Sequence, residues 1–291
     1  MHSSFQVDSF DSPSLLKDVW IGIRKSYLAV ASLGFLFFLL LAAIFVPVFS
    51  SHGFNQIQFS LSYHPPSTHF WMGTDDLGRD LFTRIFLGAR ISLWVAFFSG
   101  LINLTLGLFY GIFAGYQGKK TEEVLMRICD IINAIPQILI AIIFVITIGR
   151  GLPSILFTIC LTGWIDMARI VRNHTLQLKN KPFVLSSLAL GASKLHIFLH
   201  HLIPNLLGTV LATFTLTVPR AMFLESFLSF LGLGIQPPGA SWGVMIGKGI
   251  FVMQYHPWVL FFPCLLISLT MLSFNLLGNH LRDVLDPRLR V

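Results

Sequence analysis

Residues 182–204 read PFVLSSLALGASKLHIFLHHLIP and form the longest organised segment outside the apolar runs of the chain. Pro182 suits the first position of a helix, where its missing N–H costs nothing. Gly191 tolerates a left-handed backbone and marks a helix end, while Ser193 can cap a second helix. Pro204 lacks the N–H that a continuing helix would use, so we expect a break or kink there. The segment therefore predicts two short helices joined by a turn.

The second of these helices carries an apolar stripe, because its large apolar residues recur at helical spacing. The stripe consists of Leu195, Phe198, Leu199 and Leu202. Basic residues surround the segment, at Arg169, Arg172, Lys179, Lys181 and Lys194. An apolar face needs a surface that buries it, and two alternatives are open: the protein's own membrane helices, or a separate cytoplasmic protein.

The composition places the rest of the chain in a membrane. Of the 291 residues, 54% are hydrophobic and 11% are charged, and the mean hydropathy is +0.75, whereas a soluble domain carries about 25% charged residues. A backbone in lipid must satisfy its own hydrogen bonds, so a closed bundle of helices is expected. The fold class is therefore an all-α membrane protein, with one membrane domain over nearly the whole length.

Apolar runs predict six transmembrane helices, at about residues 26–50, 91–116, 123–148, 152–172, 206–232 and 257–279. The predicted segments are an N-terminal cytoplasmic segment 1–25, the first span 26–50, a periplasmic loop 51–88, a core 89–279 with five spans and the loop 180–205, and a cytoplasmic tail 280–291.

Three local features refine this outline. Pro136 predicts a kink within the third span, and Gly149-Arg150-Gly151 predicts a tight turn. Residues 233–256 are expected to form a loop. Small residues along the second span favour close helix packing, and they are Gly100, Gly107, Gly111 and Gly115.

Orientation follows from Lys and Arg, which gather in cytoplasmic loops. With the N-terminus inside, 14 of the 20 basic residues lie in inner segments. Both termini and residues 180–205 are therefore expected in the cytoplasm of a multi-pass protein. The same bias accounts for the net charge of +7, and no basic–aromatic arrangement of the kind that stacks nucleic-acid bases is present.

The sequence offers no catalytic or metal-binding set. Cys129, Cys160 and Cys264 lie apart from one another in apolar segments. This is typical of small buried residues rather than of disulfide or metal partners. His200 and His201 are adjacent but lack a metal-ligand spacing. No nucleophile–base pair and no glycine-rich phosphate loop is present. We expect no catalytic residue, no metal and no cofactor in this chain, and a transport subunit rather than an enzyme.

Ionisable residues within spans are costly and are functional candidates. Arg127 with Asp130, and Asp166 with Arg169, are three apart, so each pair is expected to neutralise itself on one helix face. Arg220 and Glu225 are five apart and point to different faces. They need partners on another helix, another subunit or a water-filled path, and we expect one of them to border a translocation pathway.

Several strings in a fixed order resemble a known family. They are 73–80 (GTDDLGRD), 88–93 (GARISL), 189–193 (ALGAS) with 204–205 (PN), 228–234 (LSFLGLG) with 236–238 (QPP) and 241–243 (SWG), and 274–278 (FNLLG) with 281–283 (LRD) and 286–288 (DPR). The chain resembles a permease subunit of a bacterial ABC importer of the dipeptide, oligopeptide and nickel class. Within that class it is most similar to the C-type permease of the oligopeptide systems, from about residue 70 to the end.

The resemblance implies an ATP-driven importer of peptides in the bacterial inner membrane. The loop 180–205 would dock on a cytoplasmic ATPase through Phe183, Leu185, Ser186, Ser187, Leu188, Ala189, Gly191, Ala192, Ser193 and Pro204. The implied partners are a second permease, two ATPase subunits that bind ATP and magnesium, an extracytoplasmic solute-binding protein, the peptide and membrane lipid. The binding protein would contact Asp75, Arg79 and Asp80, unless these residues tie the outer loop down through local salt bridges.

The chain departs from the family in one place. Members of the family usually carry Glu-Ala-Ala at the start of the coupling loop, where this chain has Leu185, Ser186 and Ser187. Docking would then depend on apolar contact, or coupling through this subunit would be weaker. The alternatives are import of nickel or another small solute, a self-powered secondary transporter or channel, and an intramembrane enzyme.

Overall fold

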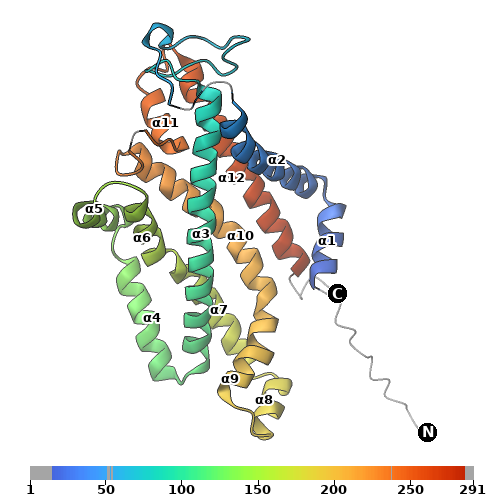
Figure 1. Ribbon diagram of the computed structural model, residues 1–291. Coiled ribbons are helices and arrows are strands. Elements are labelled where there is room, and N and C mark those ends of the chain that lie inside the picture. Colours follow the sequence, from blue (N-terminus) through green and yellow to red (C-terminus); the bar gives the residue numbers. More distant parts are fainter. Residues whose placement is uncertain (1–14, 51–52, 54, 237, 286–291) are drawn as a thin grey trace.

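The computed structural model describes residues 15–50, 53, 55–236 and 238–285, and these form an all-helical protein (Figure 1). The described residues contain one isolated β-bridge, between Thr74 and Asp80, and no strand. This confirms the predicted fold class. The helices are α1 Leu15–Lys25, α2 Tyr27–Phe49, α3 Leu81–Tyr116, α4 Lys119–Asn133, α5 Gln137–Ile148, α6 Leu152–Thr162, α7 Trp164–Leu178, α8 Pro182–Ala189, α9 Lys194–Ile197, α10 Ile203–Phe230, α11 Trp242–Gly249 and α12 Pro257–Leu285.

Five helical segments are long and apolar enough to cross a membrane: α2, α3, α6 with α7, α9 with α10, and α12. Helices α4 and α5 pass the same test together but meet at an angle of 76°. The predicted number of six spans is reached when this bent pair counts as one. Pro136 lies at the bend, so the kink predicted from that proline is confirmed.

Several boundaries differ from the sequence prediction. Helix α3 begins at Leu81, so the end of the predicted loop 51–88 is helical. Helix α12 continues to Leu285, and α11 lies inside the predicted loop 233–256. The first difference has a clear cause, because Arg84 is neutralised by a buried carboxylate of the neighbouring loop. A prediction from hydropathy counts such an arginine as a charged residue that is exposed to water. The predicted span therefore starts too late in the sequence.

The break predicted at Pro204 is wrong. Helices α9 and α10 form one continuous helical segment, Lys194–Phe230, with a π-helical turn at Phe198–Leu202. Pro204 lies in the first turn of α10, directly after this wider turn. A π turn changes which carbonyl groups face the following residues, so the proline ring is accommodated without ending the helix.

Helix α3 lies along α7 with almost no side chains between the two backbones. A Cβ atom added at Gly111 would lie 2.6 Å from the backbone oxygen of Ala168, and one at Gly115 would lie 2.8 Å from that of Arg172. A Cβ atom added at Gly107 would lie 2.5 Å from the Met167 Cβ and 2.9 Å from the Trp164 backbone oxygen, while Gly100 faces α10. The close approach predicted from these glycines is therefore confirmed, and we call the α3–α7 contact the glycine seam.

The two ends of the molecule differ in structure. The turn between α3 and α4 lies at the same end as α8 and α9, and the loop before α3 lies at the opposite end with α11 (Figure 1). Helix α11 is fixed by Trp242, which is fully buried and donates from Nε1 to the Ile85 oxygen at 3.0 Å. A predicted loop becomes a helix here because a large aromatic side chain anchors it to α3.

We expect Gly111→Ala to lower the free energy of unfolding by about 1–3 kcal/mol, since an added methyl group overpacks a backbone contact. Gly34→Ala on α2 is the matched control, because no atom lies within 4 Å of its added Cβ. Thermal unfolding of both purified variants in detergent measures the difference. Equal melting temperatures for Gly111→Ala and the parent protein would show that the seam is not tightly packed.

Candidate functional site

The segment 182–204 folds as its punctuation predicts. Pro182 is the first residue of α8, and Gly191 follows that helix with a φ of +82°. Ser193 caps α9, because its hydroxyl oxygen accepts a hydrogen bond from the His196 N–H at 3.2 Å. Helices α8 and α9 are therefore a defined pair rather than a loose loop.

The α8–α9 pair is firmly attached to the membrane helices. Val184 and Ile197 are fully buried and pack with Leu202 against apolar residues of α3 and α7. The rings of Tyr116 and Phe198 meet edge to face, with their centroids 4.8 Å apart. Movement of the pair must therefore move the bundle with it.

The apolar stripe predicted on the second helix is only partly correct. Leu202 is fully buried and Phe198 partly buried, but Leu195 is 66% exposed and Leu199 is 49% exposed. Ile197 takes the buried position instead. The π turn explains the change, because residues five apart, such as 197 and 202, share a face where the hydrogen bonds run over five residues.

Six large apolar side chains of the pair remain exposed, and they are Phe183, Leu185, Leu188, Leu190, Leu195 and Leu199. None of the residues predicted to contact an ATPase is buried: Phe183, Leu185, Ser186, Leu188, Ala189, Gly191, Ser193 and Pro204 are exposed, and Ser187 and Ala192 are partly exposed. Of the two alternatives for the apolar face, the protein's own helices therefore bury only a part.

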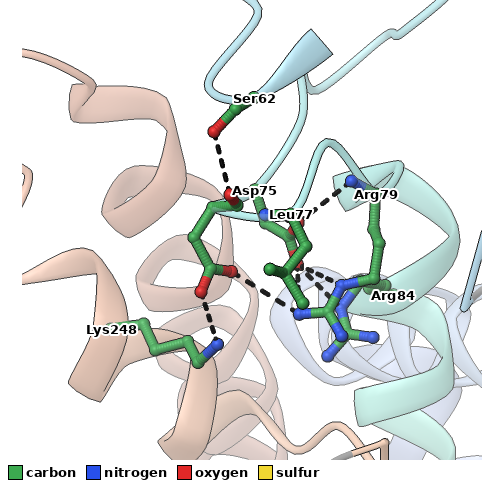
Figure 2. Close-up of polar contacts among 7 residues, drawn as sticks. Ser62, Asp75, Leu77, Arg79, Arg84 and Lys248 are labelled. Atoms are coloured by element: carbon green, nitrogen blue, oxygen red, sulfur yellow. Dashed lines mark hydrogen bonds and ion pairs between the residues drawn. The ribbon is translucent and has the colours of Figure 1, made fainter. Parts of the chain in front are cut away.

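At the opposite end, a carboxylate and two guanidinium groups are buried together. Asp75 Oδ2 lies 2.7 Å from Arg79 Nη2 and 3.3 Å from Arg84 Nε. Asp75 Oδ1 accepts from the backbone N–H of Leu77 at 2.9 Å. Figure 2 shows this network, with Lys248 of α11 reaching the loop from the other side, where it pairs with Asp76 at 2.8 Å. The network closes the loop and connects it to α11.

Asp75, Arg79 and Asp80 are 6%, 3% and 5% exposed. Asp80 caps α3, because its carboxylate accepts from the Thr83 N–H at 2.9 Å. This burial favours the alternative in which the three residues tie the loop down. Burial also raises the pKa of the nearby Tyr63 phenol, and the charges of Asp76 and Asp75 raise it further.

A cavity of about 530 Å³ lies between several of the helices and is partly open to the surface. Its polar lining comes from α3, α4, α5, α6, α7, α10 and α12, and consists of Asn103, Asn133, Gln137, Thr162, Asp166, Thr217, Arg220 and Asn275. Of Arg220 and Glu225, one of which was expected to border a pathway, Arg220 lines this cavity. The amide side chains within the apolar runs were a further signal in the sequence that was not used.

Asp130, Asp166, Arg169 and Arg220 form ion pairs between helices rather than within them. Arg220 Nη1 lies 2.9 Å from Asp166 Oδ2, and Arg169 Nη2 lies 2.8 Å from Asp130 Oδ1. The predicted pairs of Asp166 with Arg169 and of Asp130 with Arg127 are therefore wrong. The bend between α4 and α5 brings α4 beside α7, which exchanges the partners. Arg220 does find its partner on another helix, as predicted.

The Arg220–Asp166 pair is exposed to the cavity, with side chains 72% and 56% exposed. An exposed ion pair contributes about 0–1 kcal/mol to stability. The pair therefore costs little to open, and its two charges are accessible from the cavity.

Glu225 does not line the cavity. It is fully buried, and its carboxylate accepts hydrogen bonds from Ser92 of α3 at 2.8 Å and from Ser229 at 2.9 Å. Ser226 donates a third bond at 3.2 Å. The carboxylate thus joins α10 to α3 within the bundle, and Glu225 is the member of the predicted pair that does not line this cavity.

Within the part of the chain that the structure describes, no three His, Cys, Asp or Glu side chains gather to hold a metal ion. The three cysteines form no disulfide. His201 Nε2 lies 3.2 Å from the Ser187 hydroxyl, so it helps to hold α8 against the π turn.

Two family models match the chain. The family described as "Binding-protein-dependent transport system inner membrane component" matches residues 107–291. The "N-terminal TM domain of oligopeptide transport permease C" matches residues 14–66.

Three curated relatives match over nearly the whole length. The oligopeptide transport system permease protein OppC of Bacillus subtilis is 44% identical, over 96% of this chain and 92% of its own. The dipeptide transport system permease protein DppC of the same organism is 46% identical, over 98% and 90%. The glutathione transport system permease protein GsiD of Pectobacterium atrosepticum is 35% identical, over 94% and 91%.

One solved structure supports the fold alone. An inward-facing form of the MetNI methionine ABC transporter matches with a TM-score of 0.56 and 19% identity, over 68% of this chain and 94% of that chain. The arrangement of helices in that transporter is therefore shared here.

We expect Asp75→Asn to destabilise the loop before α3 by about 3–5 kcal/mol, because two buried guanidinium groups lose a charged partner. Lys248→Gln is the matched control. The Lys248 side chain is 42% exposed and pairs with Asp76 at 2.8 Å, so the loss of this pair costs about 0–1 kcal/mol. Limited proteolysis between residues 55 and 80 reports loop opening. Similar cleavage rates in the two variants would contradict the role of Asp75.

Proposed function

Because this chain belongs to the family of binding-protein-dependent transport system inner membrane components, we propose that it imports peptides as one subunit of a larger transporter. It is a transport permease and not an enzyme. Its substrates are oligopeptides or dipeptides, moved inward across the bacterial cytoplasmic membrane. The observation that carries the substrate class is the match to oligopeptide and dipeptide permeases along nearly the whole chain.

The partners follow from this class of transporter. Two ATPase subunits hold ATP and magnesium, a second permease completes the membrane pathway, and a solute-binding protein delivers the peptide. The α8–α9 pair is the docking element for one ATPase. Its exposed side chains supply an apolar surface, and its buried side chains join that surface to α3 and α7.

Docking here does not depend on an acidic residue. Leu185 stands where the family usually has Glu and is 50% exposed. It lies in α8 with Phe183 and Leu188, whose side chains are also exposed. Burial of such side chains contributes about 25 cal/mol for each Å² removed from water. The apolar surface of α8 therefore supplies the contact that the acidic residue gives elsewhere.

The orientation of the chain follows from the position of this pair. The α8–α9 end faces the cytoplasm, together with both termini, and the loop before α3 faces outward with α11. The binding protein meets the exposed surface of that loop. Asp75, Arg79 and Asp80 act beneath this surface, since they hold the loop in shape.

The cavity between α3, α7 and α10 is this subunit's part of the translocation pathway. Arg220 lines it with Asp166, and their charges are accessible from the cavity. Glu225 supports the wall from behind, through its hydrogen bond to Ser92.

We expect Gly191→Pro to abolish peptide uptake while membrane insertion stays intact. Gly191 has a φ of +82°, and proline is restricted to about −65°, so the turn between α8 and α9 must deform. Gly118→Pro is the matched control, because Gly118 has a φ of −68° and open space around it. ATP-dependent uptake of a labelled peptide is the measurement. Normal uptake by Gly191→Pro would remove the docking role of this turn.

A photoreactive residue in place of Leu188 should capture the ATPase in native membranes, and the yield of this crosslink should change when ATP is added. The matched control is the same photoreactive residue at Tyr255, which is 80% exposed in the segment between α11 and α12 and should capture no ATPase. Capture of only this chain's own helices from position 188 would mean that the pair packs inward. The transporter would then be driven by another energy source.

A further inference from the structure

The cavity holds one charge of each sign, on two different helices. Asp166 lies in the first turn of α7, and Arg220 lies in α10. Their atoms are 2.9 Å apart, and both side chains are more than half exposed. No other ionisable side chain lines the cavity among the described residues. A ligand with both a positive and a negative group can therefore replace the pair without leaving either charge alone.

A buried hydrogen-bond acceptor lies on the same wall. Asn103 of α3 is 2% exposed, and its Oδ1 has no hydrogen-bond partner among the described residues. The Asn103 amide packs so closely on Gly163 that a Cβ atom there would overlap it. Gly163 directly precedes α7, so Asn103 is held beside the turn that carries Asp166. A buried acceptor without a donor is unfavourable, and Asn103 is one of the residues that line the cavity.

The rest of the polar lining is neutral. It consists of the amides of Asn133, Gln137 and Asn275 and the hydroxyls of Thr162 and Thr217. Side-chain amides both donate and accept hydrogen bonds, which matches the alternating N–H and C=O groups of a peptide main chain. The volume of about 530 Å³ lies within the range of roughly 300–1,000 Å³ found for small-molecule sites.

We propose that this cavity holds a passing peptide by the charged ends of its main chain. Asp166 and Asn103 Oδ1 take the N-terminal ammonium group, and Arg220 takes the C-terminal carboxylate. This inference rests on the proposed function as a peptide permease. Every free peptide carries these two groups whatever its side chains, so the site selects for peptide ends rather than for sequence.

The test uses the complete transporter in proteoliposomes, with its binding protein, and the variants Asp166→Asn and Arg220→Gln. Uptake of a labelled dipeptide with free ends should fall roughly tenfold in each, as expected for a lost hydrogen bond to a charged group. Uptake of the dipeptide with a C-terminal amide should change little in Arg220→Gln, because the carboxylate that Arg220 binds is absent. Uptake of the dipeptide with an N-terminal acetyl group should change little in Asp166→Asn, because the ammonium group that Asp166 binds is absent. The ratio of variant to parent is compared, so the preference of the binding protein cancels.

The matched control is the pair Asp130–Arg169. It is also exposed and links two helices at 2.8 Å, but neither residue lines the cavity. Asp130→Asn and Arg169→Gln should keep uptake within about twofold of the parent, because an exposed ion pair contributes little.

A second measurement needs only the free dipeptide. If Asn103 and Asp166 bind the same ammonium group, Asn103→Leu should slow uptake, and the double variant with Asp166→Asn should be little slower than the slower single variant. The inference is overturned if the effects of Asn103→Leu and Asp166→Asn multiply in the double variant. It is also overturned if Asp166→Asn or Arg220→Gln slows the free, amidated and acetylated dipeptides equally, or if these variants take up the free dipeptide at the parent rate. A parent transporter that imports no peptide would instead contradict the proposed function.

Discussion

The contact on which the rest of the structure depends is the glycine seam between α3 and α7. Backbone oxygens of α7 lie where side chains of α3 would be, so the two helices behave as one unit. Packed interiors transmit displacement rather than absorb it. Helix α3 starts at the charged loop, and α7 leads directly to α8. The seam thus connects the two ends of the molecule through a rigid element that spans the membrane.

The two ends of the molecule differ in which side chains they bury and which they leave exposed. The loop before α3 contains several charges, and it buries them in local pairs, so that Asp75 neutralises Arg79 and Arg84. The α8–α9 pair has few charges and leaves large apolar side chains exposed. Exposed apolar groups that are held by a well-packed base are typical of surfaces that meet another protein. The charged loop before α3 therefore has a shape that its own salt bridges fix, whereas the α8–α9 end presents an apolar surface to which another protein can bind.

Local signals predicted much of this structure. The punctuation of α8 and α9, the bend at Pro136 and the close approach of Gly111 follow from single residues and their backbone preferences. Features that depend on distant partners were missed. Asp130 meets Arg169 only because α4 bends beside α7, and α11 is a helix because Trp242 is buried against α3. The π turn was also missed, since it depends on packing around Ile197 and Leu202.

Both charges of the cavity lie on helices that lead to the α8–α9 pair. Asp166 stands in the first turn of α7, and the chain enters α8 shortly after α7 ends. Arg220 stands on the continuous helical segment that leaves the pair at Lys194. Helix α7 has 15 residues, which at about 1.5 Å per residue makes a rod of roughly 22 Å. Because α7 and α10 both lead to this pair and meet again at the Asp166–Arg220 ion pair, a displacement of α8 and α9 that moved one of these helices relative to the other would separate the two charges. An exposed ion pair contributes only about 0–1 kcal/mol, so the pair itself would offer little resistance to such a displacement.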